Sequence, residues 1–187
     1  MFYNYIGTKE IYENVQARFK GTSIYHISDI DDWIKTTEQQ SDDYGNIIAT
    51  FVLMPDYTLR ISDRHSEHVQ CANRNPVLNA GEMTFAVNRQ NKVQNIAQIT
   101  NQSTGYCPSP TSWSKLEKAL TPLNTAYPEN FDPIYIFSYC VHCQCLKIIK
   151  DNYYFRTYCD NALPTDEEFQ QRRVQYFQYF FLGAKGR

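Results

Sequence analysis

The sequence predicts an α+β fold, an antiparallel sheet with packed helices followed by a small ribbon-like, cysteine-rich C-terminal piece. Three observations lead to this prediction. In the middle of the chain, short segments alternate apolar and polar residues, as strands with one buried face do. Two other segments follow a capping residue with apolar residues three and four positions apart, which is typical of helices that pack on a sheet. Near the C-terminus, three of the six cysteines fall within residues 140–145, a spacing that suits a metal or free thiols better than disulfides.

The length of 187 residues suits one well-buried core with a small appendage. We therefore expect an α+β core domain over residues 1–130, degenerate zinc-ribbon-like hairpins over 131–164 and an aromatic helix over 165–187. The formal net charge is −2, and neither the 18 basic nor the 20 acidic residues form a long run, so the sequence lacks the charge pattern of nucleic-acid binding. It also contains no stretch near the roughly 20 apolar residues of a membrane-spanning helix and no signal peptide, which together with the crowded cysteines predicts a cytoplasmic protein.

The first part of the chain predicts helices alternating with strands. Near-helical spacing of apolar residues predicts a short helix within residues 1–22, and residues 24–27 are predicted as a strand. Ser28 is the predicted N-cap of a helix that ends near residue 40, because aspartates fill the first turn, where the helix dipole favours acidic groups. Residues 47–54 and 58–61 flank a short turn and predict a hairpin.

Further strands and one helix are predicted in the second part. Within residues 76–100, Ala80-Gly81-Glu82 is interpreted as a turn that precedes alternating apolar positions. Ser109 as the cap and Pro110 at the first helical position predict the next helix start. Residues 134–137 predict a strand, and residues 146–149 with 153–158 predict a hairpin.

Two polar clusters, residues 64–68 and 101–108, bracket the strand-rich middle of the chain. Both follow predicted strands of one sheet, so the fold can bring them together. Polar residues on loops held by a rigid sheet are a common location for binding and chemistry. We therefore expect one polar pocket, lined by Arg64, His65, Glu67, Ser103, Thr104 and Tyr106.

The order of these motifs resembles that of an uncharacterised family of bacterial proteins. The matching segments are RHSEHV (64–69), AGEM (80–83), NQSTGYCP (101–108) and SW (112–113), within a similarity that covers about residues 49–164. In that family the motifs are followed by two C-x-x-C pairs that look like a zinc ribbon. The sequence is more distantly similar to the C-terminal region of plant calmodulin-binding IQ-motif proteins. The resemblance implies a domain and a site location but no established activity.

The cysteines depart from the pattern of that family at one position. Cys140 and Cys143 match the first pair and Cys159 matches the last cysteine, but Arg156 stands where the fourth cysteine is expected. A tetrahedral structural zinc needs four ligands, which are typically thiolates or imidazoles. The sequence therefore predicts either a zinc completed by Cys145 or by His142, or a metal-free remnant of a ribbon.

The leading functional interpretation is an intracellular binding or interaction module with a polar pocket. The alternative is a small enzyme that acts on a nucleotide or a protein. His65-Ser66-Glu67 with Cys140 and Cys143 is a weak match to the motifs of zinc deaminases, in which His and Cys bind the metal and Glu moves protons. Tyr25-His26 with Tyr106 and with Glu67 or Glu82 is similar to a pattern of ADP-ribosyltransferases. Cys107 is a further candidate, as a nucleophile with His65 or His68 as its base. A hydrogen-bonded network of His65, Glu67 and Glu82 is favoured over deaminase chemistry, and a buried inert cysteine over a nucleophilic Cys107.

The last predicted helix, from Thr165 to Leu182, opens with a capping box formed by Thr165 and Glu168. We expect part of its aromatic face to contact a protein partner or a second copy of the chain, because aromatic side chains are favoured interface anchors. The alternative is that N-terminal residues cover this helix. The aromatic face consists of Phe169, Tyr176, Phe177 and Phe180, and the candidate cover of Phe2, Tyr3, Tyr5 and Ile6.

Overall fold

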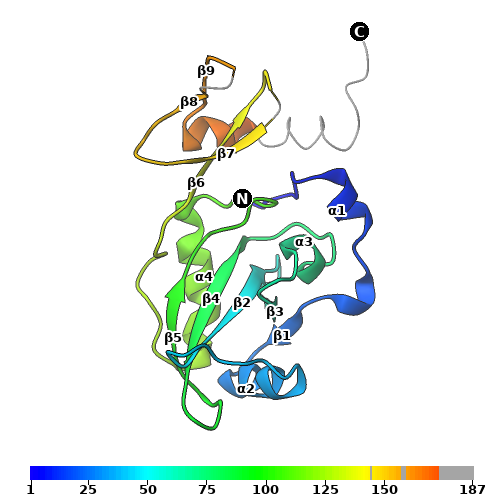
Figure 1. The fold of residues 1–187 in the computed structure, drawn as a ribbon, viewed down its shortest axis with the longest axis vertical. Coiled ribbons are helices and arrows are strands. Elements are labelled where there is room, and N and C mark those ends of the chain that lie inside the picture. The colour runs from blue at the N-terminus through cyan, green and yellow to red at the C-terminus, as the bar shows by residue number, and fades with distance from the viewer. Residues whose placement is uncertain (144, 157–158, 173–187) are drawn as a thin grey trace.

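The computed structural model describes residues 1–143, 145–156 and 159–172 and has the predicted α+β architecture (Figure 1). The described part contains one five-stranded antiparallel sheet with strand order β1-β3-β2-β4-β5 and two small two-stranded sheets, β6-β7 and β8-β9. The strands of the large sheet are β1 (Thr22–Ile24), β2 (Asn46–Leu53), β3 (Leu59–Asp63), β4 (Asn79–Val87) and β5 (Val93–Ile99). The helices before the ribbon are α1 (Lys9–Glu13), α2 (Ile27–Thr36), α3 (His68–Cys71) and α4 (Trp113–Leu120), with short 3₁₀ helices at Ala17–Phe19, Pro110–Ser112 and Thr121–Leu123.

Strand β2 is the central strand of the large sheet, and both of its faces are covered. Along its two edges it pairs with β3 and with β4. Phe51 points to a cluster that includes Trp33 of α2 and Leu116 of α4, whereas the next residue, Val52, belongs to a second cluster on the opposite face. The alternation of side chains along a strand explains this division. It also explains why the β2 sequence is apolar at nearly every position.

The predicted helix starts are close to the observed ones, with one correction. Ser109 is the N-cap of the first 3₁₀ helix after the sheet, and its side chain accepts a hydrogen bond from the Thr111 backbone. Helix α2, however, begins at Ile27 with His26 as its N-cap, not at Ser28. The Asp29 carboxylate accepts hydrogen bonds from the backbone N–H groups of Tyr25 (2.8 Å) and His26 (2.9 Å). An acidic side chain at the third helical position therefore fixes the start of α2.

The predicted turn at residues 80–82 is wrong, since these residues lie inside β4. Gly81 is required there by a close approach of two backbones, because a Cβ atom at this position would overlap the carbonyl oxygen of Thr100. The residues directly after Glu67 form the short helix α3.

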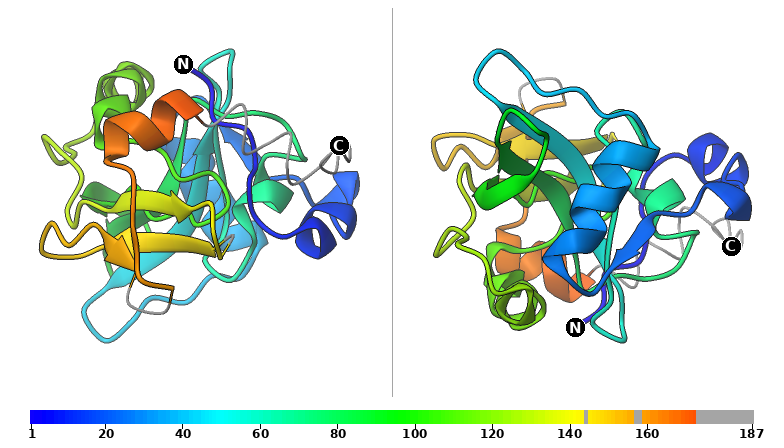
Figure 2. Two further views of the ribbon diagram at one scale, coloured as in Figure 1. Left: turned by 90° about the horizontal axis from the view of Figure 1, so that it is seen from above. Right: turned by 90° about the horizontal axis from the view of Figure 1, so that it is seen from below.

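The ribbon, residues 131–164, forms one end of the molecule (Figure 1). It contains β6 (Ile136–Cys140), β7 (Cys145–Ile149), β8 (Phe155–Arg156) and β9 (Asn161–Ala162). The predicted pairing of residues 146–149 with 153–158 is wrong, because β7 pairs with β6 and β8 pairs with β9. Seen from above, the ribbon lies across the end of the large sheet together with the helix that follows it (Figure 2).

The described part of the C-terminal helix covers residues 166–172. Its capping box is confirmed, because the Thr165 backbone donates to Glu168 Oε2 (2.8 Å) and the Glu168 backbone donates to Thr165 Oγ1 (3.3 Å). Phe169 is buried in one cluster with Ile6, so the N-terminal segment covers this position, as in the alternative interpretation. The aromatic residues 176, 177 and 180 lie outside the described residues. In the described part, no helix is long and apolar enough to cross a membrane.

Candidate metal centre

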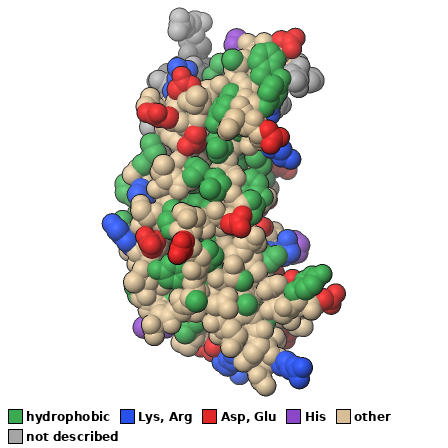
Figure 3. All heavy atoms as spheres, turned by 90° about the vertical axis from the view of Figure 1, so that its left-hand side faces the viewer, with side chains coloured by type: hydrophobic (Ala, Val, Ile, Leu, Met, Phe, Trp, Pro, Cys, Tyr) green, Lys and Arg blue, Asp and Glu red, His purple; other side chains and the backbone are tan. Residues whose placement is uncertain are grey.

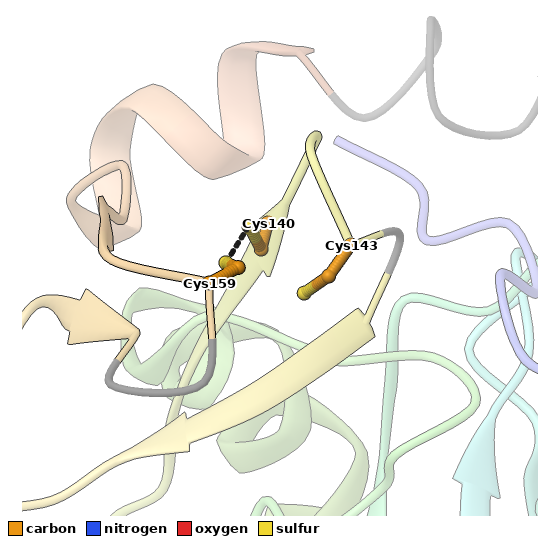
Figure 4. A group of neighbouring side chains, drawn as sticks. All are labelled: Cys140, Cys143 and Cys159. Atoms are coloured by element: carbon orange, nitrogen blue, oxygen red, sulfur yellow. Dashed lines mark hydrogen bonds between the residues drawn. The ribbon is translucent and has the colours of Figure 1, made fainter.

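Three cysteines of the ribbon meet although they come from different parts of the chain. Cys140 is the last residue of β6, Cys143 lies in the turn before β7, and Cys159 lies between β8 and β9. Their sulfur atoms all lie within 4.8 Å of one another, and those of Cys140 and Cys159 are 3.5 Å apart. Figure 4 shows the three side chains converging. This arrangement can hold a metal ion, because thiolates are strong ligands for soft metals.

The environment of these thiols favours one ionised group. Desolvation disfavours the Cys143 thiolate, but hydrogen bonds with Cys140, Cys159 and Cys145 outweigh that effect and lower the pKa of Cys143 to about 7. At Cys159, a hydrogen bond from Asn161 favours the thiolate, but desolvation and the neighbouring thiols outweigh it and raise the pKa. A cluster that stabilises one thiolate and disfavours the next would gain from a cation that compensates the negative charge.

The remaining predicted ligands stand outside this group. The Cys145 thiol donates a hydrogen bond to the Cys143 backbone oxygen at 3.2 Å. His142 is exposed in the turn between β6 and β7. Among the residues that the structure describes, only Cys140, Cys143 and Cys159 form a cluster with metal-ligand geometry. All six cysteines are reduced, and none forms a disulfide.

The structure divides the six residues of the predicted polar pocket. Arg64 and His65 are exposed and line a pocket of about 420 Å³ with the segment that joins α2 to β2. Ser103, Thr104 and Tyr106 do not line this pocket. Thr50 Oγ1 donates hydrogen bonds to the carbonyl oxygens of Arg64 and Ser66 and so fixes the path of the loop after β3. This path directs Arg64 and His65 toward the pocket.

Tyr106 is part of the packed core and does not line an open pocket. Its side chain is fully buried, and its hydroxyl donates to the Asn75 carbonyl oxygen at 2.7 Å. The ring packs edge-on against Tyr5 at a centroid distance of 5.7 Å. Burial raises the pKa of Tyr106, so the phenol is a poor acid and base. Ser103 is also buried, and its hydroxyl accepts a hydrogen bond from the Tyr106 backbone.

The other two exposed pocket candidates, Glu67 and Thr104, lie near the N-terminal segment. Burial, with the nearby charge of Glu67, raises the pKa of Tyr5 to about 12. Tyr5 also packs against Gly105, the residue after Thr104. The loops around residues 67 and 105 therefore approach each other through Tyr5.

From the sequence, His68 is only a candidate base for Cys107, whereas in the structure His68 connects α3 to the sheet. Its Nε2 atom lies 3.0 Å from the Gly81 carbonyl oxygen, so this nitrogen carries the proton and donates. Burial lowers the pKa of His68 to about 4, against the opposite effect of that hydrogen bond. The RHSEH and AGEM motifs contain both partners, but sequence spacing alone gives no sign that they meet.

Comparisons of the chain with protein-family models, curated proteins and solved structures find no match. The resemblance of its motifs to a bacterial family and to plant IQ-motif proteins therefore stays a prediction. Conclusions about function must come from the geometry of the chain itself.

Proposed function

We propose that this chain is a protein-binding module whose ribbon holds a structural zinc ion. The observation that carries the proposal is the convergence of Cys140, Cys143 and Cys159 within 4.8 Å. With Zn–S bonds of about 2.3 Å, tetrahedral geometry requires sulfur atoms roughly 3.8 Å apart. The observed separations need only small shifts to reach this value.

A structural role suits the zinc because the ribbon has little core of its own. Among the described residues, the outermost cluster of the ribbon contains only three that are buried, Cys140, Ile149 and Leu163. Small folding units with so few buried side chains commonly depend on a metal for stability. Thiolate ligands also persist in a reducing compartment, which supports a location in the cytoplasm.

Binding is favoured over catalysis because the polar groups of the motifs are already used. Tyr106 and Ser103 are buried and hydrogen-bonded, and His68 donates to Gly81. A catalytic group must reach a substrate in its correct protonation state. The pKa shifts of His68 and Tyr106 move both residues away from neutral pH and so oppose that role.

The ribbon also presents apolar side chains to solvent. The exposed fractions of Ile134, Val141 and Tyr153 are 55%, 56% and 50%. On the face shown in Figure 3, hydrophobic side chains reach the surface over the upper part of the molecule, where the ribbon lies. Aromatic and aliphatic residues on such a surface are suitable anchors for a protein partner.

Zinc analysis and site-specific crosslinking test the proposal. We expect one zinc per purified chain, lost in Cys140→Ser. A photo-crosslinking residue at position 141 should give a discrete protein adduct in cells, whereas the same residue at position 44, where Tyr44 is 89% exposed, should not. Loss of the adduct in Cys140→Ser, with the circular dichroism of the sheet retained, links binding to the folded ribbon. A metal-free chain, or equal crosslinking at both positions, contradicts the proposal.

One observation supports the alternative, a small enzyme. The pocket beside Arg64 and His65 offers a cation and an imidazole next to the carboxylates of Asp42 and Asp63. The Arg64 guanidinium is suited to bind a nucleotide or another anionic substrate there. Isothermal titration with nucleotides distinguishes the two functions, because binding that is lost in Arg64→Gln favours the enzyme, whereas an absence of binding favours the module.

A further inference from the structure

We propose that Cys145 is the fourth ligand of the metal, reached by rotation of its side chain about the Cα–Cβ bond. The site is then a closed centre of four thiolates, from Cys140 at the end of β6, Cys143, Cys145 at the start of β7, and Cys159. This inference rests on the proposed zinc and specifies its coordination. It also gives a role to a cysteine that stands outside the observed cluster of three.

Strand register places Cys145 on the correct face of the ribbon. Cys140 and Cys145 are directly opposite each other in the antiparallel pair of β6 and β7 and form its last pair before the turn. Directly opposite side chains lie on one face of the sheet, with Cβ atoms about 4.5–5.5 Å apart. The Cys145 thiol therefore starts on the same face as the Cys140 thiol, which is already in the cluster.

The present contacts of Cys145 are weak and easily exchanged. Its sulfur donates to the Cys143 backbone oxygen at 3.2 Å and also interacts with the Cys143 thiol. The side chain is half-buried, so solvent leaves room for another rotamer. Moving to the metal replaces a weak S–H hydrogen bond with a thiolate–metal bond, and the proton of the thiol passes to solvent.

The other candidates near the cluster are less suitable. Arg156 carries no metal-binding group at neutral pH. His142 is exposed and lies between the two cysteines of the turn, outside the group of converging ligand atoms in the described part of the chain. Cys71 and Cys107 belong to buried clusters of the core and of the ribbon base. Cys145 is the thiol that shares both the hairpin and its face with Cys140.

A centre of four thiolates has a chemical consequence for the ribbon. Four such ligands saturate zinc and leave no position for water or substrate, so the metal cannot act as a Lewis acid. The soft ligand set also favours zinc over magnesium, calcium or manganese. The ribbon metal then stabilises the fold and does not catalyse a reaction.

Cobalt substitution and X-ray absorption test the assignment on the full chain. In the wild-type protein, zinc X-ray absorption should give four sulfur neighbours at about 2.3 Å. In Cys145→Ser, we expect the thiolate-to-cobalt charge-transfer intensity to fall by about one quarter and the metal affinity to fall at least tenfold, by analogy with the loss of supporting ligand contacts. Cys145→His, which keeps a ligand, should retain the metal with a shifted spectrum. The matched control His142→Ala should be unchanged.

Each outcome supports or overturns the assignment. Three sulfur neighbours in the wild-type protein, or an unchanged spectrum in Cys145→Ser, overturns Cys145 as the ligand while the structural zinc stands. A changed spectrum in His142→Ala assigns the position to His142 instead. A wild-type chain that binds neither zinc nor cobalt overturns both this inference and the proposed zinc.

Discussion

At the scale of single residues, His68 and Gly81 give a structural reason for the RHSEHV and AGEM motifs. The imidazole of His68 donates to the carbonyl oxygen of Gly81, and the missing side chain of Gly81 admits the backbone of Thr100. Both residues are therefore required by contacts between distant segments. Neither contact needs a substrate, so a polar motif of this kind serves packing before it serves chemistry.

His68 should make the stability of the protein depend on pH. The unfolded imidazole binds a proton below about pH 6.5, whereas the folded one does so only near pH 4. Stability is therefore full above pH 6.5 and falls as the pH drops toward 4, with a loss of about 2 kcal/mol at pH 5. Urea unfolding at pH 7 and pH 5 measures this difference, and His68→Gln should remove about that amount from it. The exposed His65→Gln is the control. An equal pH dependence in the wild type and in His68→Gln contradicts the prediction.

Gly81→Ala should destabilise the core, because the new methyl group would overlap the backbone of Thr100. The expected decrease in the free energy of unfolding is about 1–3 kcal/mol, the usual cost of overpacking. Thr84→Ala, on the same strand at a half-buried position, is the control and should cost no more than about 1 kcal/mol. Chemical denaturation compares the two. Equal stability of Gly81→Ala and the wild type would show that the strands can separate without cost.

At the scale of elements, the outer part of the ribbon and the large sheet have separate buried clusters, whereas Phe137 and Tyr139 of β6 pack with Ile6 and Cys107 at the base of the ribbon. The sheet, α2 and α4 share a large cluster, whereas the outer part of the ribbon has the small one around Cys140, Ile149 and Leu163. Elements with separate clusters can lose structure independently. The metal therefore acts on the stability of the ribbon first.

Metal removal should loosen the ribbon and leave the sheet intact. After treatment with a chelator, amide hydrogen exchange in β6 and β7 should become faster, because the thiols no longer join the strands to the segment of Cys159. Exchange in β2 and β4 should stay slow. Hydrogen-exchange mass spectrometry with and without the chelator measures both regions. Equal loss of protection in both regions would mean that the core itself depends on the metal.

At the scale of the whole molecule, Asn101 joins the core to the ribbon. Its side chain is fully buried and donates to the carbonyl oxygens of Pro108 (2.9 Å) and Tyr135 (2.7 Å). Its amide oxygen accepts a hydrogen bond from the Tyr135 backbone at 2.7 Å. The Asn101 side chain therefore holds the connector that leads from α4 to β6, together with backbone hydrogen bonds from Asp132 to Ile99 (2.8 Å) and from Ile96 to Ala126 (2.9 Å).

Asn101→Ala should weaken the attachment of the ribbon. The change leaves buried backbone groups of Tyr135 and Pro108 without their partner, which costs about 2 kcal/mol or more. We expect a lower thermal midpoint and faster proteolysis of the connector between residues 124 and 134. The adjacent Gln102→Ala is the control. Unchanged proteolysis would show that packing and the backbone hydrogen bonds to β5 hold the connector without Asn101.

Features that depend on neighbouring residues follow from the sequence alone. Ser109 with Pro110 predicted a helix start, and Thr165 with Glu168 predicted a capping box, because caps are formed within one turn of the chain. The nearly continuous apolar run of β2 likewise indicated a strand, because it is visible in neighbouring residues. The spacing of Cys140 and Cys143 likewise places both thiols at one turn before any folding is considered.

Which distant segments meet depends on the packing of the folded molecule. That packing brings Cys159 to Cys140 across 19 positions, pairs β7 with β6 instead of with residues 153–158, and buries Tyr106 while it turns His65 to solvent. Local patterns could not settle these points, because the side of a loop on which a residue lies depends on the whole core. Neighbouring residues therefore set where caps, strands and thiols lie along the chain, whereas long-range packing sets which polar groups become structural and which stay accessible.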